Sequence, residues 1–520
     1  MATKTRFRIF ANLYKDSVAL MQLGATLRKR QGILEASCVM ATPANLAQLQ
    51  HASLSVAVDV DPSDLLVVVR GEPRACDEAI EAAQAMLQPS QAAEQAAPLA
   101  FSLPATSLAM GVERSADADL ALISVPGDYA GAEALKALSL GLHVMLFSDN
   151  VSIGEERAIK VYAEEKGLLV MGPDCGTAII NGTPLGFANV VRRGDIGLVA
   201  ASGTGLQEVT CRIHNRGGGV SQAIGTGGRD LRDEIGGLTM LQGLRALSDD
   251  PQTRVIVLIS KPPSPAIAAR IVELAVASGK PTAVHFLGAA PDRVRRAGLY
   301  AAQSLADAAD IAVTLANHGT PSESHPVFSR TALDCVEGLL DRLAPTQHAV
   351  RGLFTGGTFC YEAQLAFLKR GLPCRSNVPV NGALPLDERG EGHVFIDMGD
   401  DEYTRGRPHP MIDPSLRNAT LRATAADPAT AAILFDVVLG YGAHPDPAGE
   451  LAETLRAAQQ AAAAQGRTLA MIGHVCGTDG DPQNRAVQVN RLAEAGVIIT
   501  ESNIDAATLA ADVALRRARR

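Results

Sequence analysis

Tryptophan is absent from this chain of 520 residues, and aromatic residues make up only 4% of it. The formal net charge at pH 7 is −9. A protein that binds single-stranded nucleic acid stacks the bases on aromatic side chains inside a basic groove. This composition provides neither feature, so we expect no nucleic acid among the ligands. The terminal run RRARR is short and is typical of a solvated tail.

Long apolar runs and paired cysteines are also missing. No run of about 18 apolar residues occurs, so the sequence predicts no contact with a membrane. The first residues, MATKTRFRIFANLYKD, lack the continuous apolar segment of a signal peptide. The eight cysteines are scattered without a C-x-x-C spacing, which predicts neither a disulfide framework nor a metal site. Together these absences favour a cytoplasmic protein.

A motif that occurs twice is the most informative feature of the chain. Residues 202–217 read SGTGLQEVTCRIHNRG, and residues 356–371 read GGTFCYEAQLAFLKRG. Aligned without gaps, both contain Gly-Thr, then a glutamate, then Arg-Gly. The matched pairs are Gly203 and Gly357, Thr204 and Thr358, Glu208 and Glu362, Arg216 and Arg370, and Gly217 and Gly371.

Each copy of the motif follows a short apolar run, which predicts a strand, a glycine-containing loop and a helix. The start of such a helix points free backbone N–H groups and the positive end of its dipole at whatever lies there. A phosphate or a carboxylate suits that position. We therefore predict two phosphate-binding loops, which we call the first cradle and the second cradle: Ser202, Gly203, Thr204 and Gly205, and Gly356, Gly357 and Thr358.

The repeat continues beyond these loops. Asp250-Pro251-Gln252-Thr253 and Asp427-Pro428-Ala429-Thr430 each precede an apolar run. Residues from about 195 to 315 and from about 350 to 515 therefore look like two copies of one module, longer than the units of a solenoid. From about residue 116 onward strands alternate with helices, which is typical of a parallel sheet covered on both faces. The expected fold class is multidomain α/β.

Three strings carry a resemblance to a known family: Met171-Gly-Pro-Asp-Cys-Gly176, GDIGLVAASGTGLQE at 194–208, and GGGVSQAIGTGGRDL at 217–231. They resemble the alpha subunit of succinyl-CoA synthetase and other acyl-CoA synthetases. The second module is similar to the ligase domain of the beta subunit. Over nearly its whole length the chain is similar to the FdrA family, most clearly in GDDEYTRGRPHPMIDP at 399–414 and DVVLGYGAHPDP at 436–447.

The resemblance divides the chain into four blocks. Residues 1–105 are expected to form a small α+β domain that ends in an Ala/Pro/Ser-rich linker. Residues 106–193 resemble a Rossmann-like CoA-binding-type domain, although the turn SVPGDYAG lacks the nucleotide-binding glycine pattern. Residues 194–345 and 346–520 resemble two flavodoxin-like ligase modules, the first of the alpha-subunit type and the second of the beta-subunit type.

One position departs from the synthetases. Their two matching helix starts hold the phosphate of a phosphohistidine, which lies in a Gly-His-Ala-Gly stretch. The matching residues here are Arg295-Arg296-Ala297-Gly298. An arginine is always protonated and does not accept a phosphoryl group, but it clamps a phosphate or carboxylate well. We therefore predict Arg296 as a catalytic clamp, with Glu208 either holding Arg296 or serving the structure.

Further candidates lie in the strings that resemble FdrA. Asp401, Arg405 and Arg407 are predicted to bind substrate, because rigid loops often carry binding residues; an exposed turn of paired charges is the alternative. His409 is a candidate general base, since its ordinary pKa is near neutrality; a packed hydrogen-bonding residue is the alternative. Tyr441 and His444 follow an apolar strand, where parallel sheets bind ligands, and for them a structural role is equally open.

Three functions remain open. The FdrA resemblance implies a subunit of oxamate carbamoyltransferase in allantoin and purine catabolism, which converts oxalurate and phosphate to oxamate and carbamoyl phosphate. Its ligands would be these small anions, its partners other subunits of the same pathway, and no cofactor is certain. The first alternative is an acyl-CoA synthetase-like ligase that uses CoA, ATP and Mg²⁺. The second is a non-catalytic scaffold that binds anions.

Overall fold

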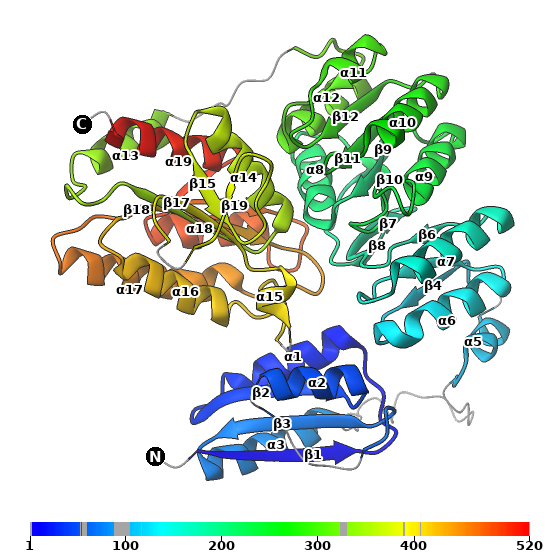
Figure 1. Cartoon of the computed structure of the whole chain (residues 1–520), viewed down its shortest axis with the longest axis horizontal. Coiled ribbons are helices and arrows are strands. Elements are labelled where there is room, and N and C mark those ends of the chain that lie inside the picture. Colours follow the sequence, from blue (N-terminus) through cyan, green and yellow to red (C-terminus); the bar gives the residue numbers. More distant parts are fainter. Residues whose placement is uncertain are drawn as a thin grey trace.

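The computed structural model describes residues 3–52, 54, 60–87, 105–115, 117–322, 330–387, 390–405 and 407–518. Residues 89–104 of the predicted linker lie outside this described part. The described elements form four sheets, each belonging to one stretch of the chain (Figure 1).

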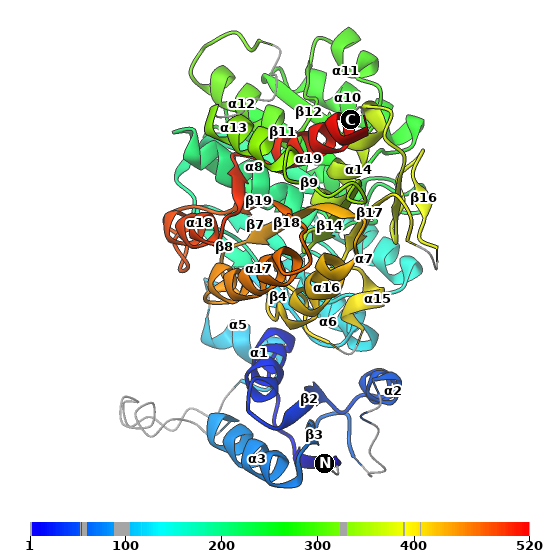
Figure 2. The ribbon, with the colours of Figure 1, turned by 90° about the vertical axis from the view of Figure 1, so that its left-hand side faces the viewer.

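The first stretch is a small α+β domain at one end of the molecule (Figure 2). Its antiparallel sheet has the order β1-β3-β2, and the valine-rich central strand is almost entirely buried. The antiparallel α+β arrangement expected from the sequence is therefore present. Its elements are β1 (Lys4–Phe10), α1 (Ser17–Arg28), β2 (Ile33–Met40), α2 (Pro43–His51), β3 (Leu65–Gly71) and α3 (Pro73–Leu87).

The second stretch is a short parallel sheet of order β4-β5-β6. Its helix α7 begins at a capping box made by Ser152 and Glu155 and ends at Gly167, whose φ of 69° suits a glycine. The elements are α5 (Leu108–Arg114), β4 (Leu120–Ile123), α6 (Gly127–Ser139), β5 (His143–Leu146), α7 (Ile153–Lys166) and β6 (Val170–Met171).

The first module has a sheet of order β13-β12-β11-β9-β10-β7-β8. Its parallel strands, numbered along the chain from β9, follow the flavodoxin-like order 2-1-3-4-5, which confirms the expected fold. The sheet begins with the hairpin β7–β8, ahead of the boundary predicted at residue 194. The elements are β7 (Thr177–Ile180), β8 (Thr183–Gly186), β9 (Arg193–Ala201), α8 (Gly203–Asn215), β10 (Val220–Gly225), α9 (Leu238–Asp249), β11 (Val255–Ser260), α10 (Pro265–Ala277), β12 (Thr282–Phe286), α11 (Asp292–Arg296), β13 (Tyr300–Ala301) and α12 (Leu305–Ala316).

The second module repeats this plan with the order β16-β15-β17-β14-β18-β19-β20, all parallel. Strands β18 and β19 are buried along their whole length, as expected for parallel strands covered on both faces. The elements are α13 (Arg330–Leu340), β14 (Ala349–Phe354), α14 (Gly357–Lys369), β15 (Cys374–Ser376), β16 (Leu384–Pro385), β17 (His393–Asp397), α15 (Asp401–Thr404), α16 (Ser415–Ala426), β18 (Thr430–Val438), α17 (Pro447–Ala463), β19 (Ala470–Cys476), α18 (Arg485–Glu494), β20 (Ile498–Thr500) and α19 (Asn503–Ala518).

The two modules share one hydrophobic core. A single buried cluster runs from β9 through α8 and α12 to α14, α19 and β14. These helices therefore form a layer between the two sheets, and the modules are fixed relative to each other by apolar burial. No helix among the described residues combines the length and apolarity needed to cross a membrane.

Candidate functional site

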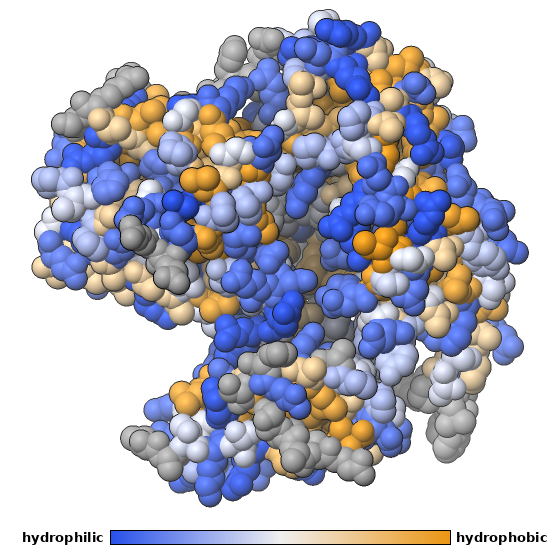
Figure 3. Space-filling model, in the orientation of Figure 1, coloured by the Kyte–Doolittle hydropathy of each residue, from blue (hydrophilic) through white to orange (hydrophobic). Residues whose placement is uncertain are grey.

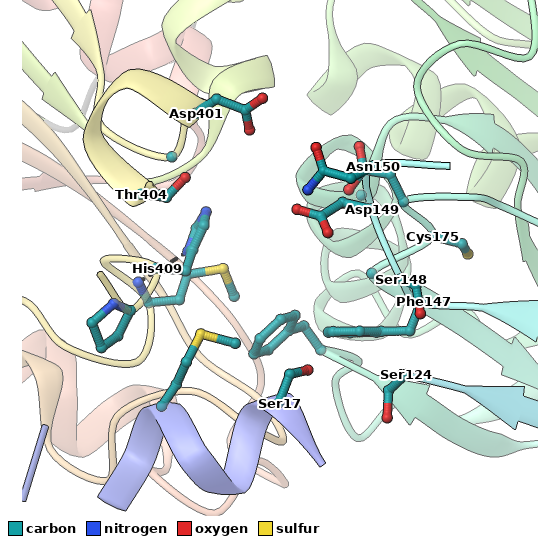
Figure 4. A pocket seen from close by; sticks show the side chains of 18 of the residues that line it. Ser17, Ser124, Phe147, Ser148, Asp149, Asn150, Cys175, Asp401, Thr404 and His409 are labelled. Atoms are coloured by element: carbon teal, nitrogen blue, oxygen red, sulfur yellow. Dashed lines mark hydrogen bonds between the residues drawn. The ribbon is translucent and has the colours of Figure 1, made fainter. Parts of the chain in front are cut away.

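A cavity of about 760 Å³ lies where all four stretches of the chain meet. We call it the central cavity; the space-filling view is hollowed between the modules (Figure 3). Its walls are α1, the turns after β4 and β5, the loops after β9, β10 and β14, and residues 397–411. Figure 4 shows Asp149 and Asn150 facing Asp401 and His409 across it, with Ser17 of α1 below.

The two cradles predicted from the sequence meet in this cavity. The Oγ atom of Ser202 lies 2.5 Å from Oγ1 of Thr358, and Ser202 Oγ also accepts a hydrogen bond from the N–H of Gly205. A Cβ atom at Gly356 would lie 2.9 Å from Cγ2 of Thr204, so the loops touch on both sides of the contact. The starts of α8 and α14 therefore share one opening, and their dipoles add there.

A buried carboxylate shapes the second cradle. Asp436, at the end of β18, accepts hydrogen bonds from the N–H groups of Thr355 (2.6 Å) and Gly356 (2.9 Å). Buried Arg417 donates to Thr355 Oγ1 at 2.8 Å and to the Asp436 carbonyl at 2.7 Å. These bonds fix the loop just ahead of Gly357, where the helix begins.

The cavity combines positive and negative groups. Helices α1, α8 and α14 begin at it, and each contributes the positive end of its dipole. Acidic side chains also line the cavity, and Asp149 and Asp174 give it an acidic wall, so the cavity suits a ligand that has both anionic and N–H groups. The lining basic residues are Lys15, Lys261, Arg405 and Arg407, and the lining acidic residues are Asp128, Asp149, Asp174, Asp397 and Asp401.

Two of these carboxyl groups titrate near neutrality. Burial, reinforced by the charges of Asp149 and Asp401, raises the pKa of Asp174 to about 6. Burial also raises the pKa of Asp397 to about 6, against the hydrogen bond that Asp397 accepts from the N–H of Gly399. A Cβ atom at Gly357 would lie 2.5 Å from Oδ2 of Asp397. Asp397 therefore places a carboxyl group of raised pKa against the start of α14.

His409 lies at the cavity but is arranged as a donor. Its Nδ1 accepts a hydrogen bond of 3.2 Å from the N–H of Met411, so the proton of the neutral ring is on Nε2. Burial lowers the pKa of His409 to about 4. The lone pair of the neutral His409 ring, on Nδ1, is already bonded to Met411, so the ring can only donate through Nε2–H. This corrects the predicted role of His409 as a general base, which would need a free lone pair.

The predicted clamp Arg296 lies elsewhere. It is the last residue of α11, its side chain is exposed, and it is not among the residues that line the central cavity. Helix α11 follows β12, which is separated from β9 and its cradle by β11. This placement corrects the expectation that Arg296 holds the anion at the first cradle.

Tyr441 and His444 also lie outside the cavity lining. The Tyr441 side chain is 45% exposed. His444 is buried, and its Nε2 lies 2.8 Å from Nζ of Lys29 and 3.4 Å from Oε1 of Glu450. Nearby, Arg28 donates to Asp413 Oδ2 at 2.7 Å. These contacts join α1 to the second module, so the structural alternative describes His444 and the substrate role is corrected.

Glu208 joins the two modules. Its Oε2 lies 2.7 Å from Nε2 of His474 on β19, and both side chains are 3% exposed. Burial alone would raise the pKa of Glu208, but the charge and hydrogen bond of His474, together with Arg212, lower it below its usual value. The carboxylate of Glu208 is thus engaged by His474, not by Arg296.

The matching residue of the second module is Glu362, and its pKa is shifted in the opposite direction, upward. Its carboxylate accepts hydrogen bonds from the N–H of Leu305 (3.0 Å) and from Asn503 Nδ2 (2.8 Å). Burial nevertheless raises the pKa of Glu362 to about 7. The duplicated glutamates have therefore diverged from each other, although they occupy the same position of the motif.

Glu362 should make the protein less stable as the pH rises. The unfolded chain releases this proton near pH 4.5, whereas the folded chain keeps it until about pH 7. Glu362 should consequently contribute a fall in folding stability of about 3 kcal/mol between these values, and Glu362→Gln should remove that contribution. Urea unfolding between pH 4.5 and 8 measures it, with Glu453→Gln on an exposed glutamate as control. An unchanged slope in Glu362→Gln would contradict the assignment.

Several cavity residues were not predicted from the sequence. Asp174 lies inside the string 171–176 that carries the family resemblance, and this position is a sequence signal that could have marked it as a site residue. Asp149 and Asp397 follow apolar strands, the same signal that led to Tyr441. Outside the cavity lining, His474, the partner of Glu208, stands in an apolar run, and only its match with His285 in the repeated module distinguishes it. Lys261 carries no such signal.

Three sequence profiles match parts of the chain. "AllF, heavy metal-associated domain" matches residues 1–100, "CoA binding domain" residues 191–288, and "CoA-ligase" residues 353–513. The protein YahF of Escherichia coli K12 is 42% identical over 96% of this chain and 96% of its own length. This chain belongs to the same family as YahF.

More distant relatives match a smaller part of the chain. Subunit alpha 2 of an ADP-forming succinate–CoA ligase from Archaeoglobus fulgidus is 29% identical over 28% of this chain and 52% of that subunit. The solved structure of PH0766 from Pyrococcus horikoshii aligns with 77% of this chain and 84% of the PH0766 chain. The sequence identity is 14% and the TM-score is 0.30, so this likeness says nothing about the site. The family member described here has a succinyl-CoA synthetase-like scaffold of the ligase type.

The name of the N-terminal profile implies a metal, but the residues do not fit one. Within the described part of the chain, no group of three or more His, Cys, Asp or Glu residues is arranged to hold a metal ion. Cys38 is buried, and burial raises the pKa of its thiol to about 12, so the thiolate that binds metals is disfavoured.

The turn after β4, in the stretch that resembles a CoA-binding domain, lacks groups that would hold a phosphate of CoA, and the matching "CoA binding domain" profile covers residues 191–288 instead. The turn carries Asp128 in the first turn of α6 and contributes no basic residue to the cavity. A Cβ atom at Gly127 would collide with the backbone of Asp149 and Asn150, so the loop after β5 closes over the start of α6. We therefore derive no chemical step through CoA at this turn.

Proposed function

We propose that this protein is the component of a carbamoyltransferase that binds the reactants, converting oxalurate and phosphate to oxamate and carbamoyl phosphate. The observation that carries the proposal is the meeting of the two cradles in one cavity, with Ser202 and Thr358 in contact. The match of residues 1–100 to a domain of AllF supports the same pathway of allantoin degradation. Other subunits would act with this chain.

The charges of the central cavity suit these reactants. Phosphate is held at the starts of α8 and α14, where free N–H groups and helix dipoles converge. Oxalurate carries a carboxylate at one end and ureido N–H groups at the other. The carboxylate meets Arg405 and Arg407, and the N–H groups meet the acidic wall that includes Asp149 and Asp174.

The reaction needs one bond formed, one bond broken and one proton moved. A phosphate oxygen attacks the terminal ureido carbon, and the oxyanion that develops is stabilised by the helix N–H groups. The bond from that carbon to the oxamate nitrogen then breaks. Asp397, beside Gly357, takes the proton from phosphate and delivers it to the departing nitrogen. Atoms and charge balance without a cofactor.

The test is phosphate release from carbamoyl phosphate, with and without oxamate, using this protein together with its candidate partner subunits. We expect oxamate-dependent release, and Arg407→Gln should raise the KM for oxamate about tenfold while changing kcat little. Arg270→Gln, an exposed arginine of α10, is the matched control. Phosphate release at the same rate with and without oxamate would refute the proposal. Formation of acyl-CoA from ATP and CoA would also refute it and would favour a ligase.

A further inference from the structure

A second cavity, of about 660 Å³, lies between the two modules. We call it the rear cavity. Helices α8 and α14 start at the central cavity, and their last turns reach the rear cavity. The first turns of α12 and α19 complete its walls, and they carry a further duplicated string: SLADAAD at 304–310 and SNIDAAT at 502–508. Matching segments of the two modules therefore line the rear cavity.

Two buried polar atoms in its wall have no hydrogen-bond partner within the described chain: Nε2 of His285 and Oγ1 of Thr508. His285 is 5% exposed and Thr508 is 2% exposed. Nδ1 of His285 lies 3.0 Å from the carbonyl oxygen of Ala302, so Nδ1 carries the proton and Nε2 presents a lone pair. Buried polar atoms nearly always have a partner, so Nε2 is an acceptor that awaits a donor.

The last turns of α8 and α14 make one wall of the rear cavity basic. Arg212 and Arg216 share the carboxylate of Asp310, at 2.7 Å and 3.3 Å. Nζ of Lys369 lies 3.4 Å from Oε1 of Gln303. A guanidinium has five N–H donors and an ammonium has three, so these contacts leave donors available for an anion.

The acidic groups of the rear cavity are held by the chain itself. Glu362 already accepts a hydrogen bond from the start of α12 at Leu305, and Asp505 accepts one of 2.6 Å from Ser502 Oγ. An anion without an O–H or N–H group, such as chloride or sulfate, would leave Nε2 of His285 without a donor. A ligand that satisfies both walls therefore needs a negative group and a hydroxyl or N–H group of its own.

We propose that the rear cavity binds a small carboxylic acid that carries a hydroxyl or N–H donor beside its carboxylate. The donor bonds to Nε2 of His285, the carboxylate meets Arg216 and Lys369, and Thr508 Oγ1 completes the contacts. This site is distinct from the cradles. Its ligand contacts α8 and α14 at the ends opposite the cradles.

The test uses glycolate and methoxyacetate as probes, since the second lacks only the hydroxyl donor. Protein labelled with ¹⁵N-histidine is titrated, and the Nε2 resonance of His285 is identified by its loss in His285→Gln. We expect a saturable shift with glycolate and none with methoxyacetate. The resonance of His393, which lies in neither cavity wall, should stay unchanged.

Thr508→Val should weaken glycolate binding roughly threefold to tenfold, as expected for one lost hydrogen bond. Gly357→Ala, at the second cradle, should leave the affinity for glycolate unchanged. Binding at the rear cavity can then be judged even if the proposed carbamoyltransferase activity is absent. No saturable shift at His285, or equal shifts with both probes, would overturn the proposal. Unchanged glycolate affinity in Thr508→Val would overturn the assignment of its hydroxyl.

Discussion

Lys160→Met should destabilise the folded protein by about 3–5 kcal/mol, because it removes the buried cation that bridges two buried carboxylates. Nζ of Lys160 lies 2.9 Å from Glu156 Oε1 and 2.7 Å from Asp230 Oδ1, and all three side chains are at most 1% exposed. Asp230 also accepts hydrogen bonds from Thr239 and Met240 at the start of α9. Without Lys160, buried Asp230 has no cation partner among the described residues, and Glu156 keeps only its pair with Arg229, at 2.9 Å.

Lys160→Met should also disturb a loop that lines the central cavity. Lys160 also donates to the carbonyl of Thr226, in the loop whose neighbours Gly225, Gly227 and Gly228 line the cavity. Urea unfolding measures the stability, and Lys136→Met is the control, since its pair with Glu133 is on the surface and contributes less than about 1 kcal/mol. Equal losses in the two variants would contradict the importance given to the buried triad.

Gly357→Ala should lower the kcat/KM of carbamoyl transfer at least about 100-fold, the effect of disturbing a preorganised set of anion-stabilising donors. The added Cβ would lie 2.5 Å from Oδ2 of Asp397. Asp397 is buried and bonded to Gly399, so the start of α14 or the carboxylate has to move. Either movement displaces the second cradle from the group that moves the proton.

Gly154→Ala provides the matched control for this substitution. Gly154 also lies in the first turn of a helix, and a Cβ atom there would meet nothing within 4 Å. Initial rates with carbamoyl phosphate and oxamate give the comparison, with circular dichroism to confirm folding. A fully active Gly357→Ala protein would exclude the second cradle from the reaction.

The architecture of the modules could be predicted because its signals are local. Alternating apolar and helical segments predict a parallel sheet, and the duplicated strings around Gly203 and Gly357 place a helix start after a strand in both modules. The meeting of the cradles also follows from duplication, since a repeated module tends to pack about an axis that brings equal positions together. Glu208 and Glu362 were recognised for the same reason.

The composition of the central cavity could not be predicted, because its contacts join distant parts of the chain. Arg28 of α1, a helix that lines the cavity, pairs with Asp413, which is 385 positions away along the chain, and neither residue has a periodic neighbour that reveals the pairing. The match of Arg296 to a family position predicts where Arg296 lies along the chain. It does not predict that strand β11 separates β12, which precedes Arg296, from β9 and the first cradle. His409 was identified, but its donor role depends on a bond to the backbone of Met411 that no sequence pattern displays.

A crystal structure of the protein with phosphate and oxamate tests the central claim most directly. We expect phosphate between Ser202 and Thr358, bonded to the N–H groups that begin α8 and α14, with the oxamate carboxylate toward Arg405 and Arg407. Phosphate bound at Arg296, with the cradles empty at saturating concentration, would contradict the account and return the anion site to the edge of the first module.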